Sequence, residues 1–521
     1  MQASEADLLS ILRRHWGYEA FRPLQERVIR STVGGHDVAL VMPTGGGKSL
    51  CYQLPAVVLG GTCIVVSPLI ALMKDQAAHL EAAGIRAAAL NSTMAPDEQR
   101  QVIRDAAAGA YRLLYLSPER LARADTIGWL QLVPISFFAI DEAHCISEWG
   151  HEFRPEYREL WRLREAFPQR SISAFTASAT RRVRHDILRQ LRLRDPHCYI
   201  TSFRRPNLSY IVRECVDPFL QEKLLLGALE AHKGRNVIVY CPTIRAVEST
   251  TANLNRRGIR AIPYHGQMEA PERTRNQEIW MSDERPVLVG TIAFGLGINK
   301  PSVRAVIHLS LPKSLEQYYQ EAGRAGRDGE PADCLLLWQR SDIGLLGHFA
   351  SQIEDEEERK RAWWRLKVMR GFAETKVCRQ RQICVHFGEN PKWGRCEVCD
   401  VCGYGPEWLA EDPPHPLGLS RRPKKRRMVA APEPAVVPRS VSAEPLPEAD
   451  PALVERVRIW RLEKAREAAV PAYVILHDRT LLEICRRRPA DFAELLEVPG
   501  VGPGKAERFG AEILELVAGR Q

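Results

Sequence analysis

The sequence predicts an α/β protein in which two parallel β-sheets are each covered by helices on both faces. Between residues 38 and 340, a short apolar run is repeatedly followed by a polar loop and a helical pattern. Continuous apolar strands are typical of parallel sheets, because the connecting helices bury both faces. The repeat pauses near residues 200–235, and 521 residues exceed what one hydrophobic core usually serves. We therefore expect two α/β lobes.

Nine apolar runs are the expected strands, five before the pause and four after it. They are Val38–Met42, Cys63–Ser67, Leu113–Leu116, Phe137–Ile140, Ile172–Phe175, Val237–Tyr240, Val287–Val289, Ala305–Leu309 and Cys334–Leu337.

The composition changes after the second lobe. A charged, helical pattern leads into five cysteines within residues 378–402, and a proline-rich stretch with little periodicity follows, which is typical of a linker. Helical periodicity then returns and lasts to the end. The expected domains are lobe 1 (1–200), lobe 2 (201–345), a helical zinc-binding subdomain (346–405), a basic linker (406–450) and a small all-α domain (451–521).

Composition excludes some classes of protein. Hydrophobic residues make up 45% and charged residues 26%, an ordinary globular balance. No stretch reaches the ~18 apolar residues of a membrane span, and the acidic N-terminus does not resemble a secretory signal. Thirteen cysteines, seven of them scattered singly up to Cys334, fit a reducing compartment better than a disulfide framework. We expect a cytoplasmic protein, associated with the nucleoid if bacterial.

A phosphate site is predicted after the first strand. The segment 38–49 is a strand, a glycine loop and a helix start, in which Thr44, Lys48 and Ser49 surround three glycines. Glycines let backbone amides turn toward phosphates, and the helix N-terminus adds its dipole. Lys48 would reach the β and γ phosphates of ATP, and Ser49 would bind Mg²⁺. The glycines of the predicted site are Gly45, Gly46 and Gly47. Met42 stands where the strict pattern has glycine.

Two carboxylates end the strand 137–140. Asp141 would hold the Mg²⁺ shell, and Glu142 would orient and deprotonate the attacking water, with His144 completing the catalytic group. A surface acid pair is the alternative, and the phosphate loop about 90 residues upstream argues against it.

The second lobe offers two arginines near its end. Arg324 and Arg327 are three residues apart, so they share a face if the segment is helical. An arginine presented across a cleft can neutralise charge on the transferred phosphoryl group, which is worth on the order of 10³–10⁵ in rate. Hydrolysis would then depend on lobe closure, the physical basis of a motor. A basic surface helix is the alternative, although two glycines in a helix are costly without purpose.

Several polar side chains at strand ends can hold nucleic acid without recognising its sequence. Ser67 lies in the first lobe, and Thr243 and Thr291 occupy equivalent places in the second. After the acid pair, Trp149, Phe153 and Tyr157 are four residues apart with Arg154 among them. Such groups stack on exposed bases at about 1–3 kcal/mol each. An aromatic helix face buried in the core is the alternative.

Taken together, residues 8–402 resemble the RecQ family of superfamily-2 helicases. The resemblance implies RecA-like lobes and ATP-driven, 3′ to 5′ unwinding of DNA in recombination and repair. The stretch 16–25 looks like the family's adenine-recognition motif, in which Gln25 would contact the base and Tyr18 and Arg22 would support it. Residues 176–180 resemble the motif linking hydrolysis to movement, and residues 289–301 the motif contacting both DNA and nucleotide. Residues 143–157 resemble the family's aromatic-rich loop, except that Glu148 replaces the usual glutamine.

A structural zinc site is predicted from cysteine spacing. Cys396, Cys399 and Cys402 have metal-ligand spacing, and Cys378 lies 18 residues before the first. Four thiolates suit a closed tetrahedral Zn²⁺ site, which leaves no open position for catalysis. Cys384 and His386 compete as ligands, but the family pattern has an apolar residue at 384, so we assign that cysteine to the core.

Residues 451–521 resemble the HRDC domain, a helical DNA-binding module of this family. Its glycine-rich turn, residues 498–505, either directs amides and Lys505 at a phosphate or is simply a tight turn. Many relatives carry a winged-helix domain before HRDC, and here only the linker occupies that interval. The basic run 421–427 either tethers DNA or keeps the linker solvated. The way in which strands are parted is therefore open.

We expect the leading function to be an ATP-dependent DNA helicase using ATP, Mg²⁺ and Zn²⁺. The alternatives are a DNA-stimulated ATPase that translocates with weak strand separation and a DNA-binding adaptor with an inactive ATP site. The expected partners are single-stranded and forked DNA, single-strand-binding proteins and recombination proteins, with no membrane contact. A monomer is expected.

Overall fold

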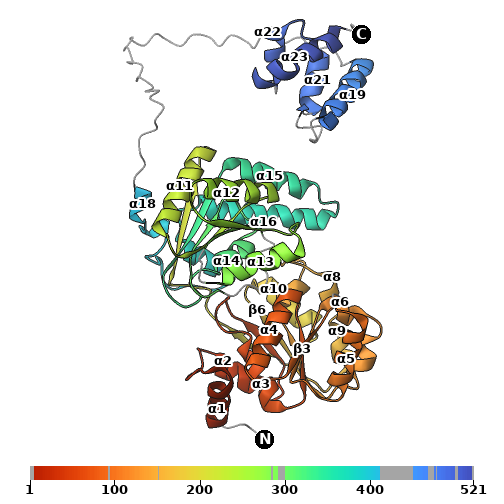
Figure 1. The fold of residues 1–521 in the computed structure, drawn as a ribbon, viewed down its shortest axis with the longest axis vertical. Coiled ribbons are helices and arrows are strands. Elements are labelled where there is room, and N and C mark those ends of the chain that lie inside the picture. Colours follow the sequence, from red (N-terminus) through yellow and green to blue (C-terminus); the bar gives the residue numbers. More distant parts are fainter. Residues whose placement is uncertain are drawn as a thin grey trace, which may run out of the picture. The chain divides into compact units, whose positions relative to one another are not determined.

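The computed structural model describes residues 5–91, 94–150, 152–282, 286–291, 300–410, 450–467, 475–476, 478–498, 501 and 503–518. The chain separates into two compact units, residues 1–416 and 417–521 (Figure 1). Among these residues, no helix is both long and apolar enough to cross a membrane.

The first lobe is a seven-stranded parallel sheet in the order β3-β4-β2-β5-β6-β1-β7. Its strands are β1 (Val38–Val41), β2 (Thr62–Val66), β3 (Ala87–Leu90), β4 (Leu113–Leu116), β5 (Ile135–Ile140), β6 (Ile172–Thr176) and β7 (His197–Ile200). The helices are α1 (Glu5–Trp16), α2 (Gln25–Val33), α3 (Leu50–Leu59), α4 (Ile70–Ala82), α5 (Pro96–Ala107), α6 (Pro118–Ala122), α7 (Thr126–Leu130), α8 (Pro155–Arg158), α9 (Trp161–Ala166) and α10 (Arg181–Gln190), with a 3₁₀ turn η1 (Ala143–Ile146). Every residue of β2, β4 and β6 is buried, as expected for strands covered on both faces.

The second lobe is a six-stranded parallel sheet in the order β10-β11-β9-β12-β13-β8. Its strands are β8 (Leu208–Glu214), β9 (Asn236–Tyr240), β10 (Ala261–Tyr264), β11 (Val287–Gly290), β12 (Val303–His308) and β13 (Ala332–Trp338). Its helices are α11 (Pro218–Ala231), α12 (Ile244–Arg256), α13 (Ala270–Met281) and α14 (Leu315–Ala322). Two parallel α/β lobes confirm the predicted fold class.

Each of the nine expected strands overlaps an observed one, but four observed strands were not expected. These are β3, β7, β8 and β10. All four lie at sheet edges, and β7 has no fully buried residue. Edge strands need less apolar sequence because one side is open, so a search for apolar runs overlooks them.

A helical subdomain follows the second sheet and packs on its edge. It comprises α15 (Arg340–Ser351), α16 (Glu356–Glu374), α17 (Arg379–His386), the 3₁₀ turn η3 (Asp400–Cys402) and α18 (Glu407–Ala410). The Asp400 carboxylate accepts a hydrogen bond from the Val212 amide of β8 at 3.0 Å and pairs with Arg379 at 2.9 Å. The expected boundary between residues 345 and 346 falls inside α15, which begins at Arg340.

All regular secondary structure among the described residues of the second unit is helical, as expected. Its helices are α19 (Pro451–Glu467), α21 (Asp478–Arg487), α22 (Phe492–Leu496) and α23 (Pro503–Ala518). They enclose a separate core that includes Leu453, Trp460, Ile484 and Ile513. The predicted basic run 421–427 lies outside the described residues.

Candidate nucleotide, nucleic-acid and metal sites

The loop between β1 and α3 has the backbone needed to enclose phosphates. Gly45 and Gly47 both have φ of 85°, a conformation that glycine adopts without strain. A Cβ at Gly46 would lie 2.5 Å from Cγ of Met42, so this position also excludes larger residues. Met42 itself is buried and fills the space behind the loop. Three predicted nucleotide ligands on the loop remain partly exposed: Thr44, Lys48 and Ser49.

The side chains predicted to recognise adenine lie against this loop. Nε2 of Gln25 donates to the carbonyl oxygens of Gly46 (3.3 Å) and Gly47 (3.1 Å), and its Oε1 accepts from the Arg22 amide at 2.8 Å. The Arg22 guanidinium donates to another carbonyl of the loop. Tyr18 is 56% exposed. The structure therefore brings Arg22 and Gln25 to the phosphate loop. Tyr18, a few residues before them in the sequence, lies at the surface.

The acid pair lies at the carboxyl end of β5. Burial, together with the neighbouring Glu142, raises the pKa of Asp141 to about 6, against the opposing effect of Lys48. Glu142 has φ of 45°, a strained value for a residue with a side chain, and such strain is typical of functional sites. Nδ1 of His144 lies 3.2 Å from the Glu142 carboxylate. Burial opposes the charged form of His144, but Cys145 and Glu142 outweigh it and raise its pKa.

A line of polar contacts runs from the acid pair to the second lobe. Nδ1 of His144 lies 3.0 Å from Oγ1 of Thr176. Thr176 in turn donates to the Ser178 carbonyl at 3.1 Å. The Ser178 hydroxyl accepts a hydrogen bond from Nε2 of Gln320, on α14 of the second lobe, at 3.0 Å. The two lobes are thus connected through side chains that begin at Glu142.

The two arginines of the second lobe lie beyond the end of α14, in turns, and not on one helix face. The condition for a shared helix face, that the segment be helical, is therefore not met, because α14 ends at Ala322. A Cβ on Gly45 would lie 3.4 Å from Cγ of Arg327, so this side chain rests against the phosphate loop of the first lobe. Burial, together with repulsion from Arg324, lowers the pKa of Arg327 to about 9. Arg327 still remains cationic at neutral pH.

Arg205 joins the lobes and was not anticipated from the sequence. Its guanidinium donates to the carbonyl of Thr44 in the phosphate loop at 3.2 Å. It also donates to three carbonyls of the turn that carries the second-lobe arginines: Gly323 (3.4 Å), Ala325 (3.2 Å) and Gly326 (3.1 Å). The residue lies in the connection before β8. Nothing in the sequence around it marks it, and only these contacts distinguish it from other arginines.

The predicted phosphate-gripping residues have different environments. Ser67 is buried at the end of β2, and its hydroxyl has no hydrogen-bond partner among the described residues. Thr243 is exposed and caps α12 by accepting from the Ala246 amide at 3.1 Å. Thr291 is half-buried after β11, but residues 292–299 of the same motif lie outside the described part of the chain. The side chain of Lys505 is also outside it.

The aromatic segment after the acid pair is not one continuous helix, because Trp149 and Phe153 lie between the 3₁₀ turn η1 and the short helix α8, which carries Tyr157. Tyr157 is fully buried and donates to the Asp141 carbonyl at 2.9 Å, so it belongs to the core. Trp149 is only partly buried, with the Arg182 guanidinium 3.1 Å from its ring centre. Phe153 carries Arg158 over its ring at 5.3 Å, and Arg154 approaches Glu119 at 3.5 Å. The loop therefore offers Trp149, Phe153 and Arg154, while Tyr157 holds it in place.

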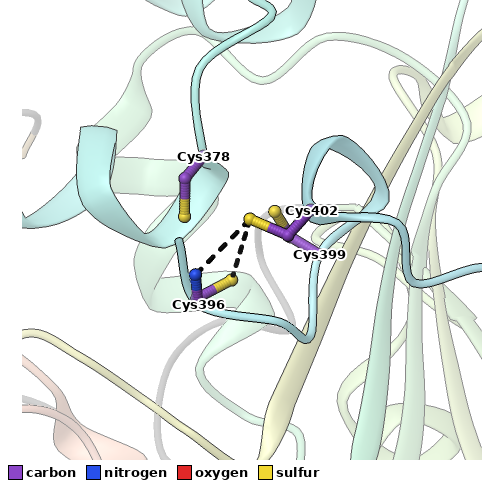
Figure 2. Close-up of side chains that lie close together, drawn as sticks. All are labelled: Cys378, Cys396, Cys399 and Cys402. Atoms are coloured by element: carbon purple, nitrogen blue, oxygen red, sulfur yellow. Dashed lines mark hydrogen bonds between the residues drawn. The ribbon is translucent and has the colours of Figure 1, made fainter. Parts of the chain in front are cut away.

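Four cysteines converge at the predicted zinc site (Figure 2). The Sγ atoms of Cys378, Cys396, Cys399 and Cys402 all lie within 4.8 Å of one another. Hydrogen bonding from Cys396 lowers the pKa of Cys399 to about 5, so a thiolate forms readily there. The two competing candidates are not in this group: Cys384 is fully buried, and His386 pairs with Glu316 at 2.6 Å. The thiol set fits a tetrahedral Zn²⁺.

Four family models match this chain in succession. They are DEAD/DEAH box helicase over residues 22–187, helicase conserved C-terminal domain over 220–329, RecQ zinc-binding over 340–403 and HRDC domain over 450–517. The phosphate loop and acid pair lie within the first match, Arg327 within the second and the four cysteines within the third.

Curated relatives are similar over nearly their full length. The protein called ATP-dependent DNA helicase RecQ in Pasteurella multocida is 34% identical over 593 positions, which cover 98% of this chain and 93% of the relative. The protein of that name in Bacillus subtilis is 36% identical over 581 positions, covering 97% of each. Both alignments are longer than the 521 residues of this chain, so both relatives contain residues without a counterpart here.

Solved structures share the fold at low sequence identity. Mycobacterium smegmatis helicase Lhr, bound to ssDNA and AMP-PNP, superposes with a TM-score of 0.51 and 19% identity, over 71% of this chain and 58% of that one. S. cerevisiae Dbp5, bound to RNA and ADP BeF3, superposes with a TM-score of 0.53 and 16% identity, over 69% of this chain and 97% of that one.

Proposed function

This chain belongs to the RecQ family of helicases, and from that premise we propose that it is an ATP-dependent DNA helicase that moves 3′ to 5′ on single strands in recombination and repair. The observation that carries the proposal is the contact between Arg327 of the second lobe and Gly45 of the phosphate loop. An arginine placed there can stabilise charge on the transferred phosphoryl group only while the lobes are closed. Hydrolysis and lobe movement are thereby coupled.

Each residue at the nucleotide site has a proposed role. Lys48 and the loop amides bind the phosphates, and Ser49 and Asp141 hold Mg²⁺. Glu142 orients and deprotonates the attacking water. Arg324 and Arg327 act from the second lobe. The proposed positioning contacts are Tyr18, Arg22, Gln25 and Thr44 for the nucleotide and His144 for the acid pair.

The nucleic-acid path is proposed to run across both lobes. Ser67, Thr243 and Thr291 would contact the phosphate backbone, and Trp149, with Phe153 and Arg154, would stack on bases. The four cysteines would hold structural Zn²⁺. Their loop is joined to β8 through Asp400, so the metal would stabilise the subdomain against the second sheet. Lys505 would add a DNA contact in the HRDC domain.

The proposed domains are 1–200, 201–345, 346–405, a linker at 406–450, and 451–521. We further propose a monomer that acts on chromosomal DNA in the cytoplasm beside single-strand-binding and recombination proteins. No winged-helix domain fits between the zinc-binding match, which ends at residue 403, and the HRDC match, which begins at 450. This interval favours, as a second candidate, a translocase with weak strand separation.

A forked duplex with a 3′ tail tests the proposal in the presence of Mg²⁺ and ATP. Strand separation that exceeds that of a 5′-tailed duplex is expected, and the ATPase rate with single-stranded DNA is measured in parallel. Lys48→Ala is the control, because it should abolish turnover while leaving DNA affinity largely intact. Stimulated ATPase without strand separation would favour the translocase, and no stimulation by DNA would refute both.

A further inference from the structure

Trp149, a partly buried aromatic of the segment 143–157, is covered by guanidinium groups from two different parts of the chain. Arg182 comes from α10 of the same lobe and lies 3.1 Å from the ring centre. Arg361 comes from α16 of the zinc-binding subdomain and lies 5.6 Å from it. A guanidinium over an indole is attracted by the ring's electron-rich face. A stacked base also needs a face of the ring, so a guanidinium that covers the indole competes with a base.

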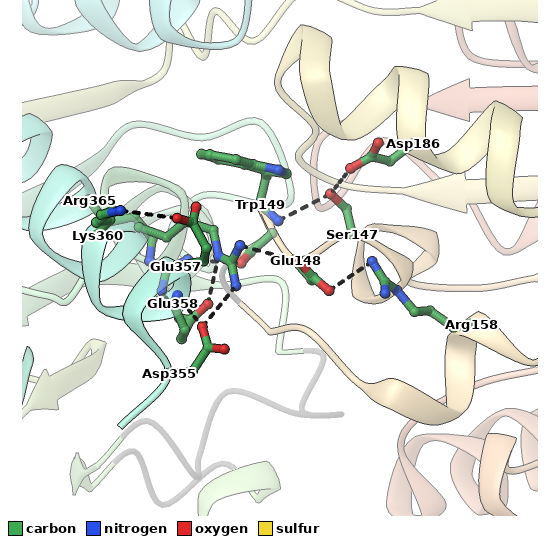
Figure 3. A network of polar contacts seen from close by, with 12 residues as sticks. Ser147, Glu148, Trp149, Arg158, Asp186, Asp355, Glu357, Glu358, Lys360 and Arg365 are labelled. Atoms are coloured by element: carbon green, nitrogen blue, oxygen red, sulfur yellow. Dashed lines mark hydrogen bonds and ion pairs between the residues drawn. The ribbon is translucent and has the colours of Figure 1, made fainter. Parts of the chain in front are cut away.

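Glu148 holds Arg361 in this place. One carboxylate oxygen lies 3.2 Å from Arg361. The other lies 2.8 Å from Arg158, a contact drawn in Figure 3. The Arg361 side chain is only 11% exposed, so this ion pair is less screened by solvent than a surface pair. Glu358 pairs with the same guanidinium at 2.9 Å and fixes it from its own helix.

The contact continues along the loop. Arg365, four residues after Arg361 and therefore on the same face of α16, donates to the Gly150 carbonyl at 3.5 Å. The backbone of Trp149 is also held by hydrogen bonds within lobe 1. Its amide donates to the Ser147 hydroxyl (3.2 Å), which donates to Asp186 at 2.5 Å. Three consecutive loop residues, 148 to 150, thus face α16, an element of a different subdomain.

We propose that Glu148 and Arg361 are positioning residues that keep a guanidinium over Trp149 in the DNA-free protein, so that single-stranded DNA must displace Arg361 before a base can stack. The inference rests on the proposed function. It follows that the apparent DNA affinity is the intrinsic affinity multiplied by the fraction of molecules in which the ring is uncovered. Arg182 also lies over the ring but comes from the lobe that carries the loop, so of these two arginines only Arg361 makes the cover depend on a second subdomain.

The test measures the concentration of oligothymidylate that gives half-maximal ATPase in Glu148→Gln, Arg361→Gln and the double variant. We expect each single substitution to lower this concentration about threefold to fivefold, because it weakens the contact that covers the ring. The rate at saturating DNA should change by less than about twofold, since chemistry is untouched. The double variant should match the singles, because both remove one contact.

Arg370→Gln is the matched control: Arg370 lies on the same helix and pairs with Glu374 at 2.9 Å, away from the loop. It should leave half-activation unchanged. Simple repulsion between Glu148 and DNA phosphates would give multiplicative effects in the double variant, and this result would overturn the proposal. An unchanged Glu148→Gln variant would overturn it as well.

Direct binding of fluorescent oligothymidylate, measured by anisotropy without nucleotide, separates this proposal from the proposed function. A tighter complex in Glu148→Gln supports the positioning role even if DNA fails to stimulate ATPase in the parental protein. Equal affinities in the parent and Glu148→Gln refute the role even if the parent is an active helicase.

Discussion

Replacing Asp141 by asparagine is expected to stabilise the folded protein while stopping ATP hydrolysis. Burial raises the pKa of Asp141 from an ordinary value of 3.8 to about 6, so the folded state disfavours the charged carboxylate. The unfolded chain ionises it freely. The free-energy penalty of folding is therefore fully present at a pH above the pKa of Asp141 in the folded state. It disappears at a pH below the pKa in the unfolded chain. Asparagine has nearly the same shape and carries no charge at any pH.

The shift sets the size of the effect. With about 1.4 kcal/mol for each pKa unit, the penalty is about 3 kcal/mol at pH 7.5 and about half of that at pH 5. These values are ceilings, because Asp141 and Glu142 titrate together. For a lobe of this size, each kcal/mol corresponds to roughly 2–4 °C in the melting midpoint.

Thermal unfolding at pH 7.5 and at pH 5, without added Mg²⁺ or nucleotide, measures this gain. Asp37→Asn is the control of opposite sign, because Asp37 is a buried carboxylate that pairs with Arg164 and accepts from the Ile172 amide at 2.8 Å. It should lower the midpoint. An Asp141→Asn variant that melts at or below the parental temperature at pH 7.5 would refute the reasoning, and so would a gain that grows toward pH 5.

Two further predictions concern the zinc site and the link between lobes. Cys399→Ser should lose the bound zinc, measured by elemental analysis, whereas Cys384→Ala should keep one zinc per chain; a reversed result would contradict the assigned ligand set. Gln320→Ala removes the 3.0 Å hydrogen bond to Ser178. It should lower the DNA-stimulated rate about fivefold with nucleotide affinity nearly unchanged, and an unaltered rate would show that this contact does not couple the lobes.

The nucleotide site was predictable from the sequence because its chemistry constrains neighbouring residues. A phosphate loop needs glycines, a lysine and a hydroxyl in one short segment, and the observed φ values at Gly45 and Gly47 show why those glycines are required. The four cysteines are similarly constrained by metal geometry. In both cases spacing along the chain carries the spatial information.

Contacts between segments far apart in sequence could not be predicted in this way. Arg205 joins the phosphate loop to the turn at 323–326, but nothing near it in the sequence marks that role. The pairing of Glu148 with Arg361 spans two subdomains. Four-residue spacing suggested one aromatic helix face including Tyr157, yet Trp149 and Phe153 lie outside any helix, and Tyr157, in α8, is part of the core. Periodicity alone does not distinguish these cases.

In the proposed mechanism, an arginine from the second lobe completes ATP hydrolysis. The most direct test is the steady-state ATPase rate of Arg327→Ala with saturating oligonucleotide. The rate should fall by about 10³-fold or more while nucleotide still binds. Arg340→Ala, which removes an exposed pair with Glu214 in the same half of the protein, should retain the parental rate. Hydrolysis by Arg327→Ala at the parental rate would contradict the coupling of the two lobes.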